Sequence, residues 1–297
     1  MCAMIIEGML GLGDNIHSRA VVRQMLDRHE VWMETPWPSV FHDLVGPRLH
    51  LMSRPSKLRT QTNNIARESD KFTAAQSPRG AINHKIWYRH DDIIRQGGFL
   101  AAMCHNSGVP VGDFSLPIPD AWRAKAAALL PTELDKPLLV YRPLVSRTEW
   151  NGCDQRNPDA AAYVELLGSI RDRFFVVSVA DLAQGKEWEV SAGIGADVAF
   201  HRGELDFEAL AGMVSLADMT WCSPGFMLVL SQALSVPMVA VFGGHESARL
   251  YDHGNSSDLF IQPQNPCECL SKTHACDKRI DMAAAKTAIQ KFTQGME

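Results

Sequence analysis

The sequence has no apolar run near the ~20 residues that a membrane-spanning helix needs. Its first ten residues include Glu7 and no basic segment, so they lack the pattern of a signal peptide. Positive charge is not in excess either, because 29 Lys and Arg residues against 34 Asp and Glu residues give a formal net charge of -5. We therefore expect a cytoplasmic protein that has no membrane span and no general affinity for nucleic acid.

Cysteine is too scarce and too irregular for a disulfide framework. The chain has seven cysteines, an odd number, and four of them stand alone at Cys2, Cys104, Cys153 and Cys222. This distribution is typical of reduced thiols.

The last three cysteines and one histidine form a separate group of four soft potential ligands within ten residues, Cys267, Cys269, His274 and Cys276. Their spacing is not that of a standard zinc ribbon or finger. The group is therefore interpreted either as a structural zinc or iron site without a catalytic role, or as ordinary reduced side chains.

The composition is that of a globular protein, with 46% hydrophobic and 21% charged residues among 297. This length suits two α/β domains of about 150 residues each. Prolines punctuate the chain on both sides of an alanine-rich helical segment that ends near residue 130. We therefore predict an N-terminal domain over 1–130 and a C-terminal domain over 131–280, with a final helical segment, 281–297, that packs back on the N-terminal domain.

Strand-like and helix-like patterns alternate in both halves. The apolar run 4–10, a glycine turn and a helical pattern open the chain, and short strands are predicted at 30–34 and 49–53. The second half has predicted strands at 138–142, 174–179, 198–201, 219–222, 238–242 and 259–262, and predicted helices at 159–173, 207–217, 225–234 and 281–292. This order predicts two Rossmann-like, doubly wound sheets whose ligands bind at the carboxyl ends of the strands.

The first glycine turn, 11–14, places a carboxylate and backbone amides at a helix N-terminus. It lacks the third glycine of the dinucleotide fingerprint, and Asp27 comes too early for a ribose-binding acid, so an oxidoreductase is disfavoured. Asp14 is either a catalytic group or a helix N-cap. His17 lies one helical turn later, where it either orients that carboxylate, touches substrate or simply packs.

Several runs in the chain resemble bacterial heptosyltransferases of glycosyltransferase family 9. The run Gly13-Asp14-Asn15-Ile16-His17-Ser18 is similar to the start of those enzymes, and the segments 205–210 and 219–244 follow the order and spacing of their second half. The segment 267–276 resembles a cysteine-bearing segment found in many members. The resemblance covers residues 1–25 and most of 135–290, and the region 35–135 has no defensible match.

The resemblance implies a GT-B fold, in which two Rossmann-like domains face each other across a cleft. It also implies an inverting, metal-independent transferase that binds a nucleotide-diphosphate sugar such as ADP-heptose in its C-terminal domain. By position, Asp14 corresponds to the proposed general base of the family. The acceptor, whether a glycan, a protein or a nucleotide, stays open.

The donor-binding positions match the family only in part. Glu208 matches an acid that contacts the donor ribose or base, although a carboxylate in a first helical turn also suits the helix dipole. The family's Asp-Ser/Thr-Gly turn falls on Pro224, Gly225 and Phe226, and its next histidine falls on Val229. Only Ser223 and the amide of Gly225 remain there for the phosphates, so the donor nucleotide is left open.

Further donor contacts are predicted from basic side chains and glycine turns. Arg142 and Arg147 flank the end of a predicted strand, and arginine can bind two phosphate oxygens at once. The predicted loop after the strand 238–242 would let a ligand approach closely. The donor-binding residues predicted in this way are Gly13, Gly243, Gly244 and His245.

Two other functions remain open from the residues. One is a nucleotide-sugar epimerase of the same architecture, whose extra acid and base residues cannot be identified in this sequence. The other is a nucleotide-sugar-binding protein without catalysis, which the altered turn at 224–226 keeps in consideration.

Overall fold

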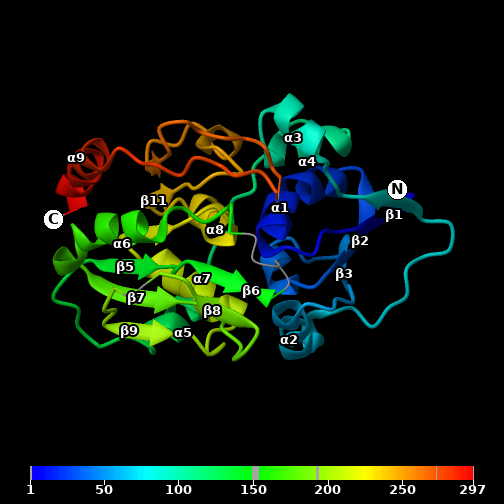
Figure 1. Cartoon of the computed structure of the whole chain (residues 1–297). Helices are drawn as coiled ribbons and strands as arrows, with labels where there is room; N and C mark the ends of the chain where they lie inside the picture. The colour runs from blue at the N-terminus through cyan, green and yellow to red at the C-terminus, as the bar shows by residue number, and fades with distance from the viewer. Residues whose placement is uncertain (1, 149–153, 192–193, 272, 297) are drawn as a thin grey trace. The chain divides into compact units, whose positions relative to one another are not determined.

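The computed structural model in Figure 1 describes residues 2–148, 154–191, 194–271 and 273–296. The chain forms two compact units, Met1–Pro117 and Ile118–Glu297. The boundary lies before the alanine-rich segment, whereas the sequence suggested a boundary after residue 130. The reason is that helix α5 (Asp120–Ala127) packs on helix α7 (Phe207–Leu216) of the second unit, where Gly212 leaves room for the Trp122 carbonyl.

The first unit is built on a parallel sheet of four strands in the order β3-β2-β1-β4. The strands are β1 (Cys2–Glu7), β2 (His29–Thr35), β3 (Leu49–Ser53) and β4 (Ile82–Lys85). The helices of this unit are α1 (Leu12–Leu26), α2 (Arg59–Arg67), α3 (His90–Gln96) and α4 (Phe99–Asn106). Two short 3₁₀ helices, η1 (Pro38–Phe41) and η2 (Ser69–Lys71), complete it.

Helix α1 is anchored by a buried charge. The Arg19 side chain is fully buried and forms a two-pronged ion pair with Asp43, with N–O distances of 2.7 and 2.8 Å. The same guanidinium donates to the backbone carbonyls of Val40 and Ser115. Because all of these acceptors come from outside α1, they fix the helix in the unit.

The second unit contains a larger parallel sheet of six strands in the order β12-β11-β10-β5-β7-β9. The strands are β5 (Leu138–Tyr141), β7 (Phe175–Val179), β9 (Val198–Phe200), β10 (Met219–Cys222), β11 (Met238–Val241) and β12 (Asp258–Ile261). A separate antiparallel ribbon pairs β6 (Val145–Arg147) with β8 (Glu187–Glu189). The remaining helices are α6 (Ala160–Gly168), α8 (Phe226–Leu234) and α9 (Met282–Thr293), with short 3₁₀ turns η4 (Arg171–Arg173), η5 (Ala248–Leu250) and η6 (Gln294–Met296).

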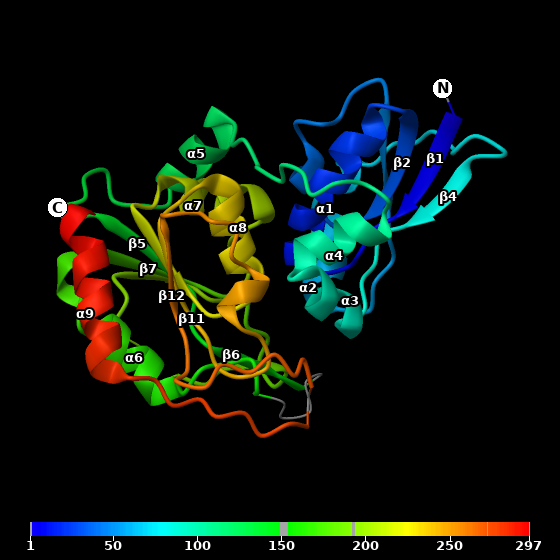
Figure 2. The same cartoon turned by 90° about the horizontal axis from the view of Figure 1, so that it is seen from above.

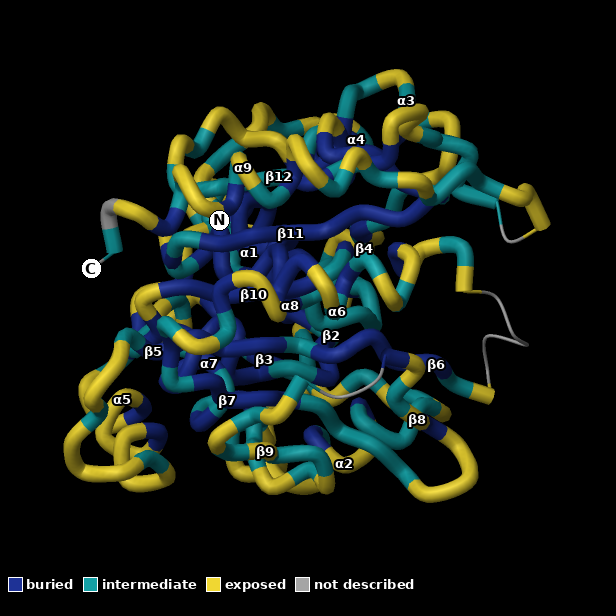
Figure 3. The backbone as a smooth tube through the Cα atoms, turned by 60° about the vertical axis from the view of Figure 1, so that its left-hand side comes forward, coloured by how far each residue is buried: buried dark blue, intermediate teal, exposed yellow. Residues whose placement is uncertain are grey.

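Helices cover both faces of the six-stranded sheet (Figure 2). Helices α6 and α9 lie on one face, where Tyr163, Leu166 and Ile289 pack against alternate residues of the central strands. Helices α7 and α8 lie on the other face. Because both faces are covered, every residue of β5, β10 and β11 is buried (Figure 3), as expected of a central parallel strand.

The final helix differs from its expected place. We expected 281–297 to pack on the N-terminal half, but α9 packs on α6 and β12 of the second unit. Its Ile289 is fully buried in the core of that unit, and Arg173 donates hydrogen bonds to both the hydroxyl and the carbonyl of Thr293. The apolar stripe of α9 fills a gap over this sheet, and sequence pattern alone does not specify which sheet receives such a stripe.

Two further predictions concern membrane-spanning helices and the state of the cysteines. None of the helices in the described residues is long and apolar enough to cross a membrane. The six described cysteines are free thiols, and Cys153 lies outside the described residues.

Candidate active site

The turn after β1 is held by buried polar side chains. The Asn15 amide donates to the carbonyls of Met9 and Gly11 at 2.8 and 2.7 Å, and its oxygen accepts from the Thr35 hydroxyl at 2.7 Å. The Trp37 indole and the Gln61 amide both donate to the Leu10 carbonyl, at 3.0 and 2.8 Å. This turn therefore has a fixed backbone, which is what a group placed at its end requires for precise chemistry.

Asp14 lies at the end of this turn, as the third residue of α1, and Gly11 is the N-cap. The interpretation of Asp14 as the N-cap is therefore wrong by position. The Tyr88 hydroxyl donates to Asp14 Oδ1 at 2.5 Å. A Cβ at Gly11 would overlap the Asp14 carboxylate in its present orientation, so glycine there leaves the space that the carboxylate occupies.

His17 packs inside the first unit. Its side chain is 2% exposed, and its ring meets Phe114 edge-on with 5.1 Å between ring centroids. A ring in this position supports the helix by packing, and direct contact with a substrate would need it to move. Its predicted catalytic role stays a prediction, and packing is the role that the described contacts favour.

In the second unit, Arg142 follows β5 and lies beside the turn after β10. Its backbone amide bonds to the Trp221 carbonyl at 2.9 Å, and its guanidinium carbon lies 4.4 Å from the centre of the Phe226 ring. Burial, with a smaller effect of the Arg147 charge, lowers the pKa of Arg142 to about 10, so the side chain stays charged at neutral pH. Among the described residues, no acidic side chain forms an ion pair with Arg142.

The turn between β10 and α8 offers backbone amides. Gly225 is the N-cap of α8 with φ 150, a conformation that favours glycine, and a Cβ there would meet open space. Ser223 directly follows β10 and is partly exposed. The first amides of α8 thus lie next to Phe226 and the cation stacked on it, an arrangement that suits an anion.

Two other predicted donor contacts already have partners of opposite charge. Arg147 pairs with the buried Glu187 across the β6–β8 ribbon, with an N–O distance of 3.4 Å. Glu208 lies 3.3 Å from the Lys125 ammonium, which also pairs with the N-cap Asp206 at 2.5 Å. A donor that used either side chain would compete with these pairs.

The glycines after β11 serve packing within the chain. A Cβ at Gly243 would overlap the backbone of Asn157, and a Cβ at Gly244 would overlap Cys276. His245 adopts a positive φ of 74. The close approach that we predicted at this loop is therefore made by the protein's own segments, and its contact with a donor stays a prediction.

The cysteine and histidine group comes together in space, with its four ligand atoms within 4.8 Å of one another. His274 Nδ1 lies 3.5 Å from Cys267 Sγ and 3.3 Å from Cys276 Sγ, and the sulfurs of Cys269 and Cys276 are 3.6 Å apart. Bonds of about 2.3 Å to sulfur and 2.0 Å to nitrogen place tetrahedral ligand atoms roughly 3.5 to 3.8 Å apart. The donor set and its spacing therefore fit a tetrahedral zinc or iron ion.

This group lies directly against the loop after β11. The His245 amide donates to Cys276 Sγ at 3.2 Å, and the Leu270 amide donates to the His245 carbonyl at 2.9 Å. No sequence pattern predicts this contact, because the two segments are separated along the chain.

Sequence reasoning missed three contacts of the site. Tyr88 follows β4, a short and largely exposed strand without an apolar alternation, so nothing marked the residue as one at the end of a strand. Phe226 was seen only as a lost family residue, although its ring supports Arg142. Lys125 lies on α5, whose packing on α7 is a tertiary contact.

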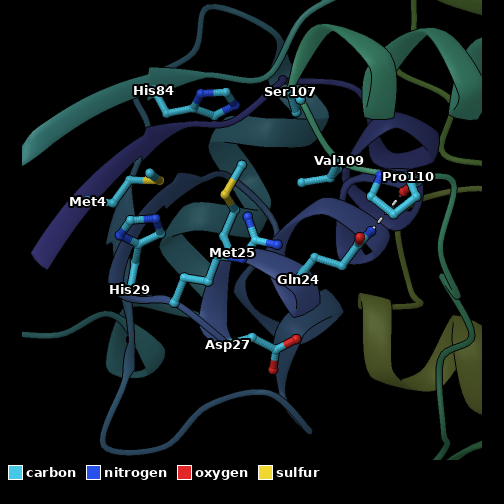
Figure 4. Close-up of a pocket in the computed structure, with 11 residues that line it drawn as sticks. Met4, Gln24, Met25, Asp27, His29, His84, Ser107, Val109 and Pro110 are labelled. Atoms are coloured by element: carbon cyan, nitrogen blue, oxygen red, sulfur yellow. Dashed lines mark hydrogen bonds between the residues drawn. The ribbon is translucent and has the colours of Figure 1, made fainter. Parts of the chain in front are cut away.

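A pocket of about 340 Å³ in the first unit lies at the other end of α1 from Asp14. Figure 4 shows the Gln24 amide in its wall donating to the Pro110 carbonyl, at 2.9 Å, with His29 and His84 also lining the pocket. Burial lowers the pKa of His84, which favours its neutral form. None of the predicted site residues lines this pocket.

Comparison with solved structures identifies the fold. The chain is similar to the iron-containing dodecameric glycosyltransferase TibC from enterotoxigenic E. coli, with a TM-score of 0.63 and 15% identity over 100% of this chain and 77% of TibC. It is also similar to a family 9 glycosyltransferase from Veillonella parvula, with a TM-score of 0.62 and 12% identity over 98% and 97% of the two chains.

The E. coli heptosyltransferase WaaC, solved with ADP, has a TM-score of 0.56 and 11% identity over 98% of this chain and 99% of WaaC. No model of a known protein family matches the chain. No curated protein matches it by sequence. The comparison confirms the predicted fold: the chain has the GT-B fold, in the form found in heptosyltransferases of glycosyltransferase family 9.

Proposed function

We propose that this protein is a metal-independent, inverting glycosyltransferase that acts in the cytoplasm. It transfers a sugar from a nucleotide-diphosphate sugar of the ADP-heptose kind to an acceptor hydroxyl. The observation that carries the proposal is Arg142, a partly buried cation that forms no ion pair with an acidic side chain among the described residues, beside the N-terminus of α8. A structure of TibC was determined with ADP-D-beta-D-heptose, which supports a donor of this class.

The donor phosphates would bind between Arg142 and the first amides of α8. The leaving nucleoside diphosphate carries negative charge that must be balanced as the sugar departs. Arg142 supplies a full positive charge, while the Gly225 turn and Ser223 supply hydrogen-bond donors. Because Arg142, Ser223 and the backbone amides supply these contacts, they do not need the Ser/Thr side chain that the resembled family carries at the position of Gly225.

Asp14 would act as the general base. As the acceptor oxygen attacks the anomeric carbon, its proton passes to the Asp14 carboxylate, and the bond to the phosphate oxygen breaks with its electron pair. A carboxylate held by a rigid turn is suited to this step, because general-base catalysis depends first on position. Glu208 would contact the donor ribose or base by exchanging its bond to Lys125. The acceptor is a glycan, a protein or a nucleotide that bears a free hydroxyl.

Thermal shift with a nucleotide panel tests the donor site. ADP, UDP, GDP and CMP, and ADP-heptose with the common UDP and GDP sugars, would be screened with the full chain. We expect a nucleoside diphosphate and its sugar to raise the melting temperature with increasing concentration, because they bind the native state. If no member of the panel stabilises the protein, the transferase proposal fails.

Asp14→Asn tests the base. We expect the rate of transfer to fall by about 10² to 10⁴ while the dissociation constant of the donor stays within twofold, as for loss of a general base. Full activity in this variant would remove the assignment. Conversion of the donor sugar in the absence of any acceptor would instead indicate an epimerase, and donor binding without turnover a binding protein.

We also propose that Cys267, Cys269, His274 and Cys276 hold a structural zinc or iron ion, outside the chemical step. A tetrahedral site of three thiolates and one imidazole would fasten the segment 267–276 to the loop after β11. Elemental analysis should find about one metal ion per chain, and Cys269→Ser should lose it and melt at a lower temperature. Equal metal content in the two proteins would contradict the site.

A further inference from the structure

Tyr88 and Asp14 come from two neighbouring strand ends. Strands β1 and β4 pair in parallel with Glu7 opposite Lys85, so the segments that follow them leave the same edge of the sheet. Along these segments the Tyr88 hydroxyl reaches Asp14 Oδ1 at 2.5 Å. A distance this short is typical of an O–H donor bonded to an ionised carboxylate.

The Tyr88 ring packs on an aromatic side chain of the first unit, and the backbone before it is hydrogen-bonded. It meets Phe99 edge-on, with 5.5 Å between ring centroids and 71° between ring planes. Before it, the Ile86 amide continues the ladder to the Glu7 carbonyl at 3.1 Å, and the Asn106 amide donates to the Trp87 carbonyl at 3.3 Å. The hydroxyl is therefore presented from a fixed ring.

The segment after Tyr88 is fixed as well. The Arg89 amide donates to the Asp92 carboxylate at 3.0 Å, which starts α3, and the Asn106 amide binds the same carboxylate at 3.0 Å. These contacts join the C-terminal end of α4 to the loop that carries Tyr88. Because Asn15 fixes the opposite turn, both partners of the Tyr88–Asp14 bond have supported backbones.

We propose that Tyr88 is a positioning residue for Asp14, whose hydroxyl holds the carboxylate in the single orientation from which it takes the acceptor's proton. The inference rests on the proposed function, with Asp14 as the base. Tyr88 exchanges no proton in the step, since the acceptor's proton goes to the carboxylate and the electron pair of the broken bond leaves with the nucleoside diphosphate. Gly11 adds to this arrangement by leaving the space that the carboxylate occupies.

Tyr88→Phe is the direct test, because it removes the hydroxyl and keeps the ring that packs on Phe99. The assay is release of ADP from ADP-heptose by the full chain, with water supplying the acceptor hydroxyl in the basal reaction so that free heptose is the other product, and with the melting temperature measured to confirm folding. We expect kcat to fall by about 10 to 100-fold and the KM for ADP-heptose to stay within twofold, because orientation contributes to the chemical step and not to donor binding. Tyr141→Phe is the matched control, since it removes a buried hydroxyl of the second unit; its kcat should stay within twofold.

A double variant separates positioning from general packing. If Tyr88 acts only through Asp14, then Tyr88→Phe has no further effect on the residual rate of Asp14→Asn, so the two losses are strongly non-additive. Additive losses would overturn the inference, and so would a wild-type kcat in Tyr88→Phe beside an inactive Asp14→Asn. Absence of ADP release by the wild-type protein, or full activity of Asp14→Asn, would remove the proposed function and this inference with it.

Discussion

The turns after β1 and β10 have the same strand-turn-helix layout but are held by different contacts. Each links a parallel strand to a helix through a glycine N-cap, Gly11 in the first unit and Gly225 in the second. Buried side chains fix the first turn, which ends in an acid, whereas the second combines backbone amides with one cation stacked on an aromatic ring. A turn that presents backbone amides tolerates changes of side chain, which is consistent with Gly225 at the position where the resembled family carries Ser or Thr.

The largest expected effect concerns the ion pair that anchors helix α1, the helix that follows the first turn. Asp43→Asn leaves the buried Arg19 without its carboxylate, and we expect the free energy of unfolding to fall by about 3 kcal/mol. Chemical denaturation measures the loss, and hydrogen exchange of α1 peptides shows whether it is confined to the first unit. Asp120→Asn is the matched control, because it makes the same chemical change in the exposed ion pair of Asp120 with Arg123. It should change the free energy of unfolding by less than ~0.5 kcal/mol. Equal losses in the two variants would contradict the anchor.

The ion pair of Arg19 with Asp43 also makes the unfolding free energy of the first unit depend on pH. Burial alone would raise the pKa of Asp43, but the hydrogen bonds and charge of Arg19 lower it below its usual value. A lowered folded-state pKa adds stability above the unfolded pKa of about 3.9, and that stability is lost as pH falls through the folded pKa. The difference in unfolding free energy between wild type and Asp43→Asn should therefore shrink as pH is lowered below about 4. A constant difference would show that this pair is not the cause.

Substitutions at the second turn should change the affinity for a ligand and not the free energy of unfolding. Arg142→Met keeps much of the apolar stem and removes the charge, so the dissociation constant for ADP should rise by about 10 to 50-fold, as for lost hydrogen bonds to a charged group. Calorimetric titration with ADP measures the change. Arg123→Met, which removes an exposed cation of the same unit, is the control. An unchanged affinity in Arg142→Met would break the comparison between the two turns.

Phe226 should have a smaller effect on the same quantity. Phe226→Leu keeps an apolar side chain but removes the ring over which the Arg142 guanidinium lies, 4.4 Å from its centre. A cation–π contact of about 0.5 to 1 kcal/mol corresponds to a two- to fivefold loss of affinity for ADP. If the leucine variant binds ADP as tightly as the wild type, the aromatic ring does not position Arg142.

The smallest expected effect is at Lys125. Its pairs with Asp206 and Glu208 are partly exposed, so Lys125→Met should change the free energy of unfolding by less than about 1 kcal/mol. The informative measurement is again the affinity for ADP. A lower dissociation constant in Lys125→Met would show that the lysine competes with the donor for Glu208, and an equal one would indicate that Glu208 does not contact the donor.

The regular parts of the fold could be predicted from the sequence because their signals are local. Strands such as 219–222 and 238–241 are short, largely apolar runs, and α8 lies between these two strands, so the predicted bounds agree closely with the structure. Strand β4 was missed because its residues are mostly exposed and carry no alternation. Helices α3 and α4 lie in the region 35–135, which has no match to the resembled family. Helix α4 packs on α1 and α3 packs on α4, and both are tertiary contacts.

The same difference between local signals and tertiary contacts holds for the candidate site. Asp14 and Gly225 could be found because a glycine turn after a strand is a local signal. The support of Asp14 by Tyr88, and the pairing of Glu208 with Lys125, join residues more than 70 positions apart in the sequence. No spacing rule reaches that far, so these contacts follow only from the way the sheets and helices pack.

The contact between Gly244 and Cys276 has a consequence for related sequences. A Cβ at position 244 would occupy the space of the Cys276 side chain, so the two positions cannot change independently. The nearest atom is the Cβ of Cys276, which every residue but glycine carries, so a related chain with a side chain at 244 must have glycine at 276 or a cysteine segment shifted away from the loop. Covariation of these two columns among homologues would thus record, across evolution, whether the cysteine segment still rests on the loop.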